Sequence, residues 1–161
     1  MPLSSERDAV AAALGRIPSG AGILTAAHAG RRTGMLASWF QQASFDPPVV
    51  TVAVRRGRPV QSLIEASSAF VLNVAAESCS TAWFKHFGRG FSPEEDAFTG
   101  WTVDDTEFGP TLSEGASALG CRVCGRLETG DHVVFAGQVI AALGDSARAP
   151  YVHVRRNGLS Y

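Results

Sequence analysis

The chain has 161 residues, an apolar fraction of 45% and a formal net charge of −1. This length predicts a single domain, over residues 1–161, whose core needs neither a disulfide nor a metal. The charge excludes the large basic field of a nucleic-acid-binding protein. No apolar run is long enough to cross a bilayer, and no signal peptide is recognisable. With an odd count of three cysteines, the sequence predicts a cytoplasmic protein with reduced thiols and no membrane partner.

The first half of the chain alternates helix and strand patterns. Ser5 is a suitable N-cap and Gly15 a suitable stop for an N-terminal helix, and Val10, Leu14 and Ile17 form its apolar face. A hairpin, a third strand and a buried strand follow: Gly20–His28 with Arg32–Phe40, then Val49–Val54, then Ala69–Ala75. Pro59 suits the first position of a short helix before the last of them.

The second half predicts one more helix, a long loop and three strands. Residues 77–87 read as an amphipathic helix with Trp83 and Phe84 inward. Residues 88–108 are expected to be irregular, with a short helix near residues 93–97, and to lie over a binding site. The β-rich runs are Ala116–Leu127, Val133–Leu143 and Ala149–Val154, with a hairpin turn at residues 128–131. Six or seven strands with few helices predict a mainly β fold, a closed or nearly closed barrel with peripheral helices.

Three short motifs carry candidate functional residues, and each also has a plain structural explanation. Gly34–Ser44 places small residues and hydroxyls where a strand ends, within reach of a phosphate or a flat ring, but a polar loop would look the same. Lys85-His86-Phe87 ends a helix, where cations are favourable. Asp131-His132 follows a turn, where a histidine is usually solvated. Basic residues also cluster at Arg31-Arg32, at residues 55–58 and at Arg155-Arg156; most such clusters are solvated turns, but one could hold a single phosphate group.

The pair Cys121 and Cys124 is expected to be structural. Residues three apart on a strand point to opposite faces, so the two thiols diverge. There is no second cysteine pair to complete a zinc site, and the four histidines show no metal-ligand spacing. We therefore expect no catalytic metal. The chain also lacks the Gly-x-Gly-x-x-Gly of a Rossmann domain.

Taken in order, the motifs resemble the flavin reductase-like family, which binds FMN in a split β-barrel. The resemblance covers the chain from about Leu14 to Tyr161. Within the family, the chain looks most like the C-terminal flavin reductase domain of cyanobacterial-type flavodiiron proteins. The resemblance implies a mainly β split β-barrel with peripheral helices. The residues that carry the family resemblance are Gly34, Ala37, Ser38, Ser44, Pro47-Pro48, the run 70–74 and Gly130-Asp131-His132. The phrases that look like the flavodiiron branch are residues 14–20, residues 35–39, Lys85-His86-Phe87 and the ending His153-x-Arg155 to Tyr161.

The resemblance implies an NAD(P)H:flavin oxidoreductase, in which hydride passes from NADH or NADPH to N5 of FMN, with FAD as an alternative flavin. It also implies a homodimer with the site near the interface, and an electron-acceptor protein as a further partner. Two alternatives stay open. One is an FMN-binding electron-transfer module that reacts poorly with free NAD(P)H. The other is a split barrel that binds haem or a different ligand.

The resemblance further implies the residues of the site. His132 would be the catalytic residue on the nicotinamide side, oriented by Asp131, while Ser38, Ser44 and Lys85 would hold the phosphate. Trp39 departs from the smaller residue common at its position, and Gln42 from the usual Ser or Thr. The residues expected to contact the cofactor are Met35, Leu36, Ala37, Ser38, Trp39, Gln42, Ala43, Ser44, Ala53, Val54, Arg58, Ser62, Asn73, Val74, Lys85, His86, Phe87 and Tyr161.

Overall fold

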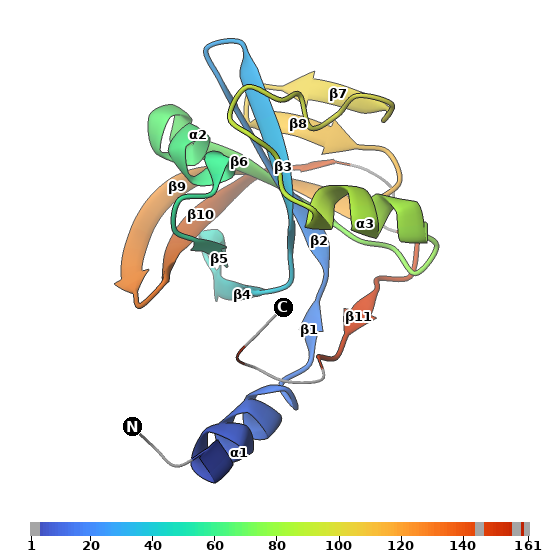
Figure 1. The fold of residues 1–161 in the computed structure, drawn as a ribbon. Helices are drawn as coiled ribbons and strands as arrows, with labels where there is room; N and C mark the ends of the chain where they lie inside the picture. Colours follow the sequence, from blue (N-terminus) through green and yellow to red (C-terminus); the bar gives the residue numbers. More distant parts are fainter. Residues whose placement is uncertain (1–3, 144–146, 156–158, 160–161) are drawn as a thin grey trace.

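The computed structural model describes residues 4–143, 147–155 and 159. It is mainly β, as the sequence predicts (Figure 1). In chain order the elements are α1 (Ser4–Leu14), β1 (Ser19–Gly20), β2 (Gly22–His28), β3 (Arg31–Ala37), β4 (Phe40–Phe45), β5 (Pro48–Arg55), α2 (Pro59–Ser67), β6 (Ala69–Val74), α3 (Thr81–Gly88), β7 (Val103–Thr106), β8 (Gly109–Leu112), β9 (Ser117–Thr129), β10 (His132–Leu143) and β11 (Val152–His153).

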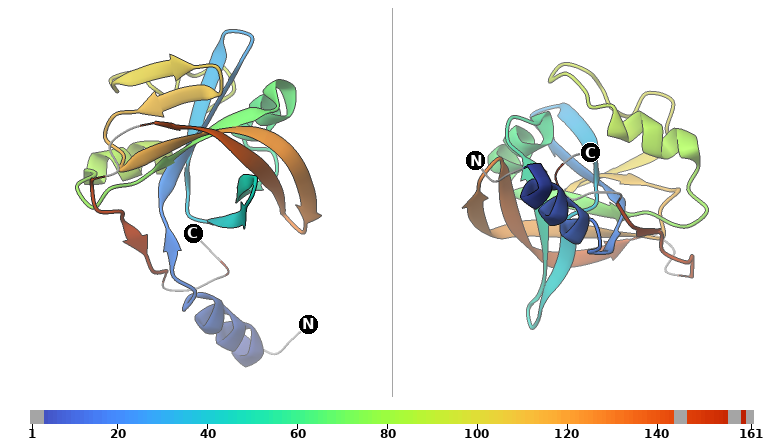
Figure 2. Two further views of the ribbon diagram at one scale, coloured as in Figure 1. Left: turned by 180° about the vertical axis from the view of Figure 1, so that it is seen from behind. Right: turned by 60° about the horizontal axis from the view of Figure 1, so that its bottom comes forward.

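Seven strands form one antiparallel sheet in the order β3-β2-β6-β9-β10-β5-β4. The long strands β9 and β10 bend together around one side of the molecule (Figure 2), and their ladder shifts register twice, between Ala136 and Gly137 and between Val139 and Ala141. Such bulges increase the local twist and bend of a strand pair, which helps a sheet to curl. The strands β3 and β4 stand at the two ends of this strand order, and a short link joins them. In that link the carbonyl of Trp39 accepts the amide N–H of Ala53 on β5 at 2.9 Å. The link between β3 and β4 is thereby tied to β5, and the sheet curls into a barrel.

Strand β2 separates two hydrophobic clusters. Leu24 and Ala26 point into the barrel, where they pack with Phe70. Ile23 points to the other side and packs with Trp83 under α3. Successive side chains of a strand face opposite sides of the sheet, so a strand buried on both faces needs a nearly continuous apolar run. This is the pattern from which the sequence predicted a buried strand here.

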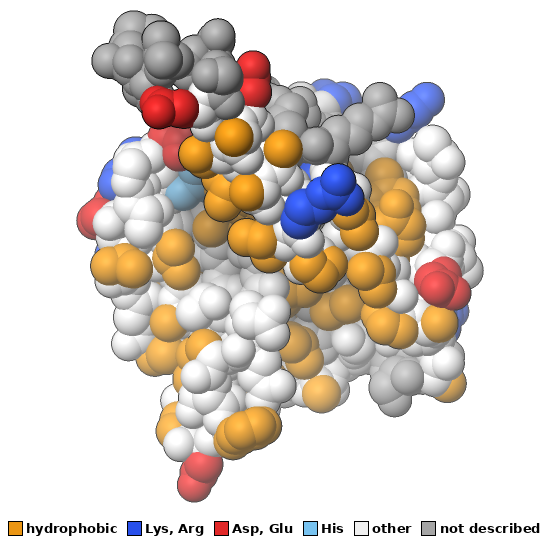
Figure 3. Space-filling model, turned by 90° about the horizontal axis from the view of Figure 1, so that it is seen from below, with side chains coloured by type: hydrophobic (Ala, Val, Ile, Leu, Met, Phe, Trp, Pro, Cys, Tyr) orange, Lys and Arg blue, Asp and Glu red, His pale blue; other side chains and the backbone are white. Residues whose placement is uncertain are grey.

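Helices α2 and α3 close the barrel from outside, whereas α1 stands apart from it (Figure 1). Pro59 is the first residue of α2, as expected, and Val60 and Ile64 are buried. The predicted apolar face of α1 is not buried, since Val10 is 51% exposed and Ile17 58% exposed. No sheet face lies opposite this helix in the single chain, so these apolar side chains remain exposed. Seen from below, hydrophobic side chains are spread over this end of the molecule (Figure 3).

Three further boundaries differ from the sequence prediction. Helix α3 begins at Thr81 and not at Glu77, because the Oγ of Ser80 accepts the amide N–H of Trp83 at 3.2 Å and caps the helix there. The last predicted strand shrinks to β11, which pairs with β1. The stretch 88–108 already contains β7, which pairs with β8 as a separate hairpin.

The short helix expected near residues 93–97 is absent, and the segment forms turns. Its acidic side chains each reach an arginine elsewhere. Glu94 pairs with Arg31, while Asp96 lies 3.0 Å from Arg32. These arginines stand at the start of β3, so the segment is spread over the β2–β3 hairpin. The described part of the chain contains no helix long and apolar enough to span a membrane.

Candidate functional site

A cavity of about 820 Å³ opens where β3, β5, α3 and the C-terminal segment meet. Its size lies within the usual range for sites that bind small molecules and cofactors, roughly 300–1,000 Å³. It is lined by Ala21, Met35, Leu36, Ser38, Arg55, Arg58, Thr81, Phe84, Phe87, Gly88, Gly90, Tyr151, His153, Val154 and Arg155.

The lining combines apolar walls with positive charge. Met35 and Leu36 of β3 and Phe84 of α3 contribute apolar side chains to the lining, while Arg55 and Arg58 contribute guanidinium groups. Among the described residues that line the cavity, none is an aspartate or glutamate. Apolar walls suit a flat ring, and guanidinium groups bind phosphate through charge-assisted hydrogen bonds. The lining therefore suits a flat molecule that carries an anionic group.

Arg58 owes its position to the start of α2 and to a nearby glycine. It occupies the N-cap position of α2 in an extended conformation, but its side chain makes no capping hydrogen bond. A Cβ placed on Gly90 would come within 2.8 Å of Nη1 of Arg58, and Gly90 has a φ of +81°. Glycine at this position thus leaves room for the guanidinium. The positive end of the α2 dipole lies beside it, which adds to the attraction for an anion.

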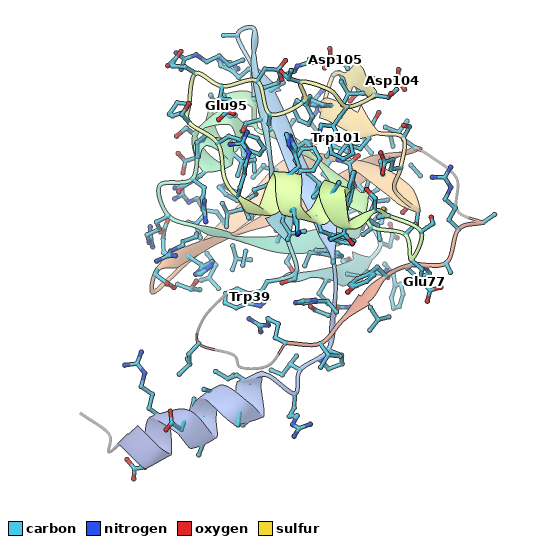
Figure 4. The ribbon with its side chains drawn as sticks, turned by 45° about the vertical axis from the view of Figure 1, so that its right-hand side comes forward. Trp39, Glu77, Glu95, Trp101, Asp104 and Asp105 are labelled. Atoms are coloured by element: carbon cyan, nitrogen blue, oxygen red, sulfur yellow. The ribbon has the colours of Figure 1, made fainter. Side chains whose placement is uncertain are left out.

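Trp39, His132 and Arg155 form a stack next to the cavity. The rings of Trp39 and His132 have their centroids 4.7 Å apart, and the guanidinium carbon of Arg155 lies 4.8 Å from the Trp39 ring centroid. Figure 4 shows Trp39 at the lower end of the barrel, facing the C-terminal segment. Arg155 lines the cavity itself, whereas Trp39 and His132 are not among its lining residues.

His132 begins β10 and is only 6% exposed. It is therefore buried, and the alternative of a solvated histidine after a turn does not hold. Its Nδ1 atom lies 2.7 Å from Oδ1 of Asp131. This hydrogen bond lowers the pKa of the Asp131 carboxyl group below its usual value. An ionised carboxylate only accepts, so Nδ1 carries the proton. In the ladder His132 is paired with Arg55, whose side chain reaches the cavity.

The C-terminal segment forms one wall of the cavity. The amide of Tyr151 donates to the carbonyl of Ala75 at 2.9 Å, which ties the segment to the end of β6. The ring of Tyr151 packs against Phe84, with centroids 5.0 Å apart. Burial, and then the positive charge of Arg155, lowers the pKa of His153 below its ordinary value of 6.5. His153 is therefore neutral at pH 7, and Arg155 supplies the charge on this wall.

The structure brings only part of the predicted set to the cavity. Met35, Leu36, Ser38, Arg58 and Phe87 line it, as the family resemblance implied. Ala37, between Leu36 and Ser38, is buried in the barrel core instead. The predicted Tyr161 lies outside the described residues.

A second part of the set lies on surfaces away from the lining. Gln42, Ala43 and Ser44 are on β4, in the β4–β5 hairpin, where a register shift leaves Ala43 without a ladder partner. Ser62 is exposed on α2, and Lys85 is exposed on α3. In a single chain these side chains do not line the cavity. The phosphate contacts expected from Ser44 and Lys85 are therefore not assembled within one chain.

Asn73, expected to contact the cofactor, has its side chain bound within the fold. Its side chain is fully buried, and Nδ2 donates to the carbonyl of Ile23 at 3.1 Å and to Oγ1 of Thr25 at 3.2 Å. Its Oδ1 accepts the amide N–H of Leu112 at 2.8 Å. The amide group thus joins β6 to β2 and β8, and all its contacts are structural.

The other inward predictions are also explained by packing. Val54 is buried in the barrel core, and Val74 packs against the same cluster. Ala53, half-buried on β5, contributes the backbone bond to Trp39. His86 lies among aromatic rings, and its Nε2 is 2.7 Å from the carbonyl oxygen of Ala97. These four residues support the walls of the site and do not line it.

Sequence reasoning missed several residues of the lining, notably Arg55, Phe84, Tyr151, His153 and Arg155. The sequence nevertheless contained two indications of these residues. Arg55 and Arg155 belong to the arginine clusters that could hold a phosphate, and Phe84 was expected to point inward. The alternation of Tyr151, His153 and Arg155 would have placed all three on one face of an extended segment.

The curled antiparallel sheet with peripheral helices is a split β-barrel, the fold of solved flavin reductases. The NADH:FAD oxidoreductase SgcE6 of Streptomyces globisporus has a TM-score of 0.83 at 24% identity, with 94% of this chain and 90% of that chain covered. A homologue of nitrilotriacetate monooxygenase component B from Mycobacterium thermoresistibile has a TM-score of 0.80 at 26% identity, covering 95% and 84%.

Residues 14–158 match the flavin reductase like domain, and the chain belongs to that family. Diflavin flavoprotein A 1 of Synechocystis sp. is 39% identical over 155 residues, which cover 92% of this chain and 26% of that protein. The chain thus spans about a quarter of the length of such curated relatives. The family and the flavodiiron-type branch expected from the motifs are confirmed.

Proposed function

We propose that this chain is a flavin reductase that binds FMN in the cavity and reduces it with NADH or NADPH. The observation that carries the proposal is the lining itself, in which the apolar wall of Met35 and Leu36 stands beside the guanidinium of Arg58. Membership of the flavin reductase like domain family supports it. The name of the Streptomyces relative, an NADH:FAD oxidoreductase, keeps FAD as the alternative flavin.

The residues present fit a flavin mononucleotide. Met35, Leu36 and Phe84 offer apolar surface for a flat ring, and Arg58 at the N-terminus of α2 offers charge and a helix dipole for the phosphate. Ser38 adds a hydroxyl to the same lining. We assign Arg58 as the main phosphate ligand, with Arg55 beside it, in place of the exposed Lys85.

A bound flavin supplies the redox chemistry, because its N5 atom accepts hydride from the dihydronicotinamide. The protein then has to orient the two rings and keep water away. We assign the positioning of the nicotinamide side to the stack of Trp39 and His132, which the Asp131 carboxylate holds in one orientation. This chemistry needs no protein nucleophile.

Anaerobic reduction tests the proposal. The purified chain is loaded with FMN, mixed with NADH or NADPH without oxygen, and followed through the visible absorbance of the flavin. We expect bleaching with at least one donor, at a rate that saturates with donor concentration. A chain that binds FMN but stays oxidised with both donors would contradict the reductase assignment.

That outcome would favour a second candidate, an FMN-binding electron-transfer module. The observation behind it is that diflavin flavoprotein A 1 is about four times longer than the matched region. Other parts of such a protein could supply or accept the electrons. Chemical reduction of the FMN-loaded chain, followed by transfer to a partner domain, would then replace reduction by free NAD(P)H.

We also propose that the chain forms a homodimer through the β4–β5 hairpin. Phe45 at its tip is 91% exposed, and Gln42 and Ser44 beside it do not line the cavity of their own chain. A second copy that received this hairpin near its cavity would bring these side chains to the cofactor. Light scattering should show a dimer for the wild type and a monomer for Phe45→Asp. A monomeric wild type would exclude this arrangement.

A further inference from the structure

Arg155 has a buried donor that the fold leaves unused. Its Nε atom is shielded from solvent and has no hydrogen-bond partner among the residues that the structure describes. The guanidinium lies over the ring of Trp39, which holds it in place by a cation–π contact. A buried charged donor without a partner is costly, and a ligand that supplies an acceptor removes that cost. Nε itself is closed to solvent, so a ligand would meet the guanidinium through the part of Arg155 that lines the cavity.

The wall around Arg155 suits a nucleotide. Tyr151, His153 and Arg155 follow one another at every second position and all line the cavity. The rings of Tyr151 and His153 are stacked, with an interplanar angle of 29° and centroids 6.5 Å apart. Aromatic faces offer a stacking surface to a base, and an arginine offers a bidentate fork to a phosphate.

Arg58 and Arg155 line the same cavity but have different surroundings, so each could bind an anion at a separate location. Arg58 packs over Gly90 at the start of α2, whereas Arg155 packs on Trp39 beside His132. FMN carries one phosphate group, for which Arg58 and the α2 N-terminus are already suited. A second guanidinium on a different wall calls for a second anionic molecule.

We propose that Arg155 binds a phosphate of the adenosine half of the dinucleotide donor and so determines donor affinity. This inference rests on the proposed function, because the donor is the second substrate of that reaction. The phosphate is either the 2′-phosphate of NADPH or the diphosphate shared by NADH and NADPH. In the first case Arg155 selects NADPH, and in the second it binds both donors.

Direct titration tests the assignment without any redox step. The FMN-loaded chain is titrated by calorimetry with ADP and with 2′,5′-ADP. Arg155→Gln should weaken phosphate binding about tenfold or more, while Arg155→Lys should retain part of it because the charge remains. Loss confined to 2′,5′-ADP identifies the 2′-phosphate, and equal loss for both ligands identifies the diphosphate. Arg16→Gln is the matched control, since it removes an exposed arginine that does not line the cavity.

Kinetics and flavin binding then complete the test. Arg155→Gln should raise KM for the donor about tenfold, with kcat and the affinity for FMN within about twofold of the wild type. Unchanged binding of ADP and 2′,5′-ADP would overturn the inference. So would a loss of affinity for FMN but not for riboflavin, because Arg155 would then serve the flavin phosphate. The proposed function fails in a different way, through a wild type that donors do not bleach.

Discussion

The Nδ1 atom of His132 lies 2.7 Å from Oδ1 of Asp131, the residue just before it in the chain. The carboxylate fixes the tautomer and the orientation of a ring that is otherwise buried. His28, by contrast, is exposed at the end of β2. The ring of His132 is thus buried and fixed by a hydrogen bond, whereas the ring of His28 is exposed to solvent.

The first prediction is that His132→Ala keeps FMN bound but slows its reduction. Because the ring packs against Trp39, its loss should disturb the nicotinamide side of the cavity and leave the Arg58 end intact. The expected decrease is roughly 10- to 100-fold, equal to about 1.4–2.8 kcal/mol of barrier. Stopped-flow reduction of the FMN-loaded variant by NADH and NADPH measures it, with His28→Ala as control. A wild-type rate with both donors would remove His132 from the site.

The second prediction concerns the flavin phosphate. Arg58→Gln should weaken binding of FMN by roughly 1.5–3 kcal/mol, the usual contribution of a hydrogen bond to a charged group. Binding of riboflavin, which has no phosphate, should hardly change. Lys85→Gln removes the same charge from the exposed face of α3 and should leave both ligands nearly unaffected. Fluorescence titration of the wild type and the two variants with FMN and with riboflavin measures these affinities. Equal loss of both flavins with Arg58→Gln would contradict the assignment.

The third prediction is that Asn73 stabilises the fold and does not bind the cofactor. Asn73→Ala removes the acceptor of the Leu112 amide inside the core, and an unpaired buried N–H costs about 1–3 kcal/mol. Denaturant unfolding should show a loss of that size or somewhat more, since two further hydrogen bonds also disappear. The affinity for FMN of the folded fraction should stay within about twofold. Lost flavin affinity at unchanged stability would restore Asn73 to the site.

The fourth prediction separates the two cysteines of β9. Burial raises the pKa of the Cys121 thiol to about 12, whereas Cys124 is exposed on the outer face of the strand. Only the thiolate reacts with disulfide reagents. In the native protein Cys124 should therefore react quickly and Cys121 only after unfolding. Cys124→Ser should leave flavin reduction unchanged, as the sequence already suggested, and lost activity in this variant would show otherwise.

Much of the barrel could be predicted because its strands carry a strong local signal. The apolar run of β2 and the Pro59 start of α2 each have a direct physical cause in the sequence. The exposure of the apolar face of α1 could not be predicted, since the sequence of an amphipathic helix does not show whether another surface packs against it. The segment 93–97 was misjudged because Glu94 and Asp96 bind arginines about 60 residues away, and no local pattern shows that.

The site was harder to predict than the fold for the same reason. A motif identifies residues near a candidate site but not which of them turn toward the cavity, as Asn73 and Arg155 illustrate. Asn73 stands inside a motif of the family, yet tertiary hydrogen bonds occupy its side chain. Arg155 stands in the C-terminal phrase His153-x-Arg155, but its place at the cavity depends on the pairing of β11 with β1 and on the hydrogen bond from Tyr151 to Ala75.

The last prediction concerns pH and tests how His153 is held beside Arg155. The pKa of His153 lies below its ordinary value of 6.5, first because of burial and then because of the Arg155 charge. Below pH 6.5 the unfolded chain therefore binds a proton more readily than the folded chain. The stability that His153 contributes is present above pH 6.5 and is lost as the pH falls through its folded pKa. Urea unfolding between pH 8 and pH 5 should show a steeper loss for the wild type than for His153→Gln. Arg155→Gln, which removes the second cause, should give an intermediate slope, and three parallel profiles would contradict the assignment.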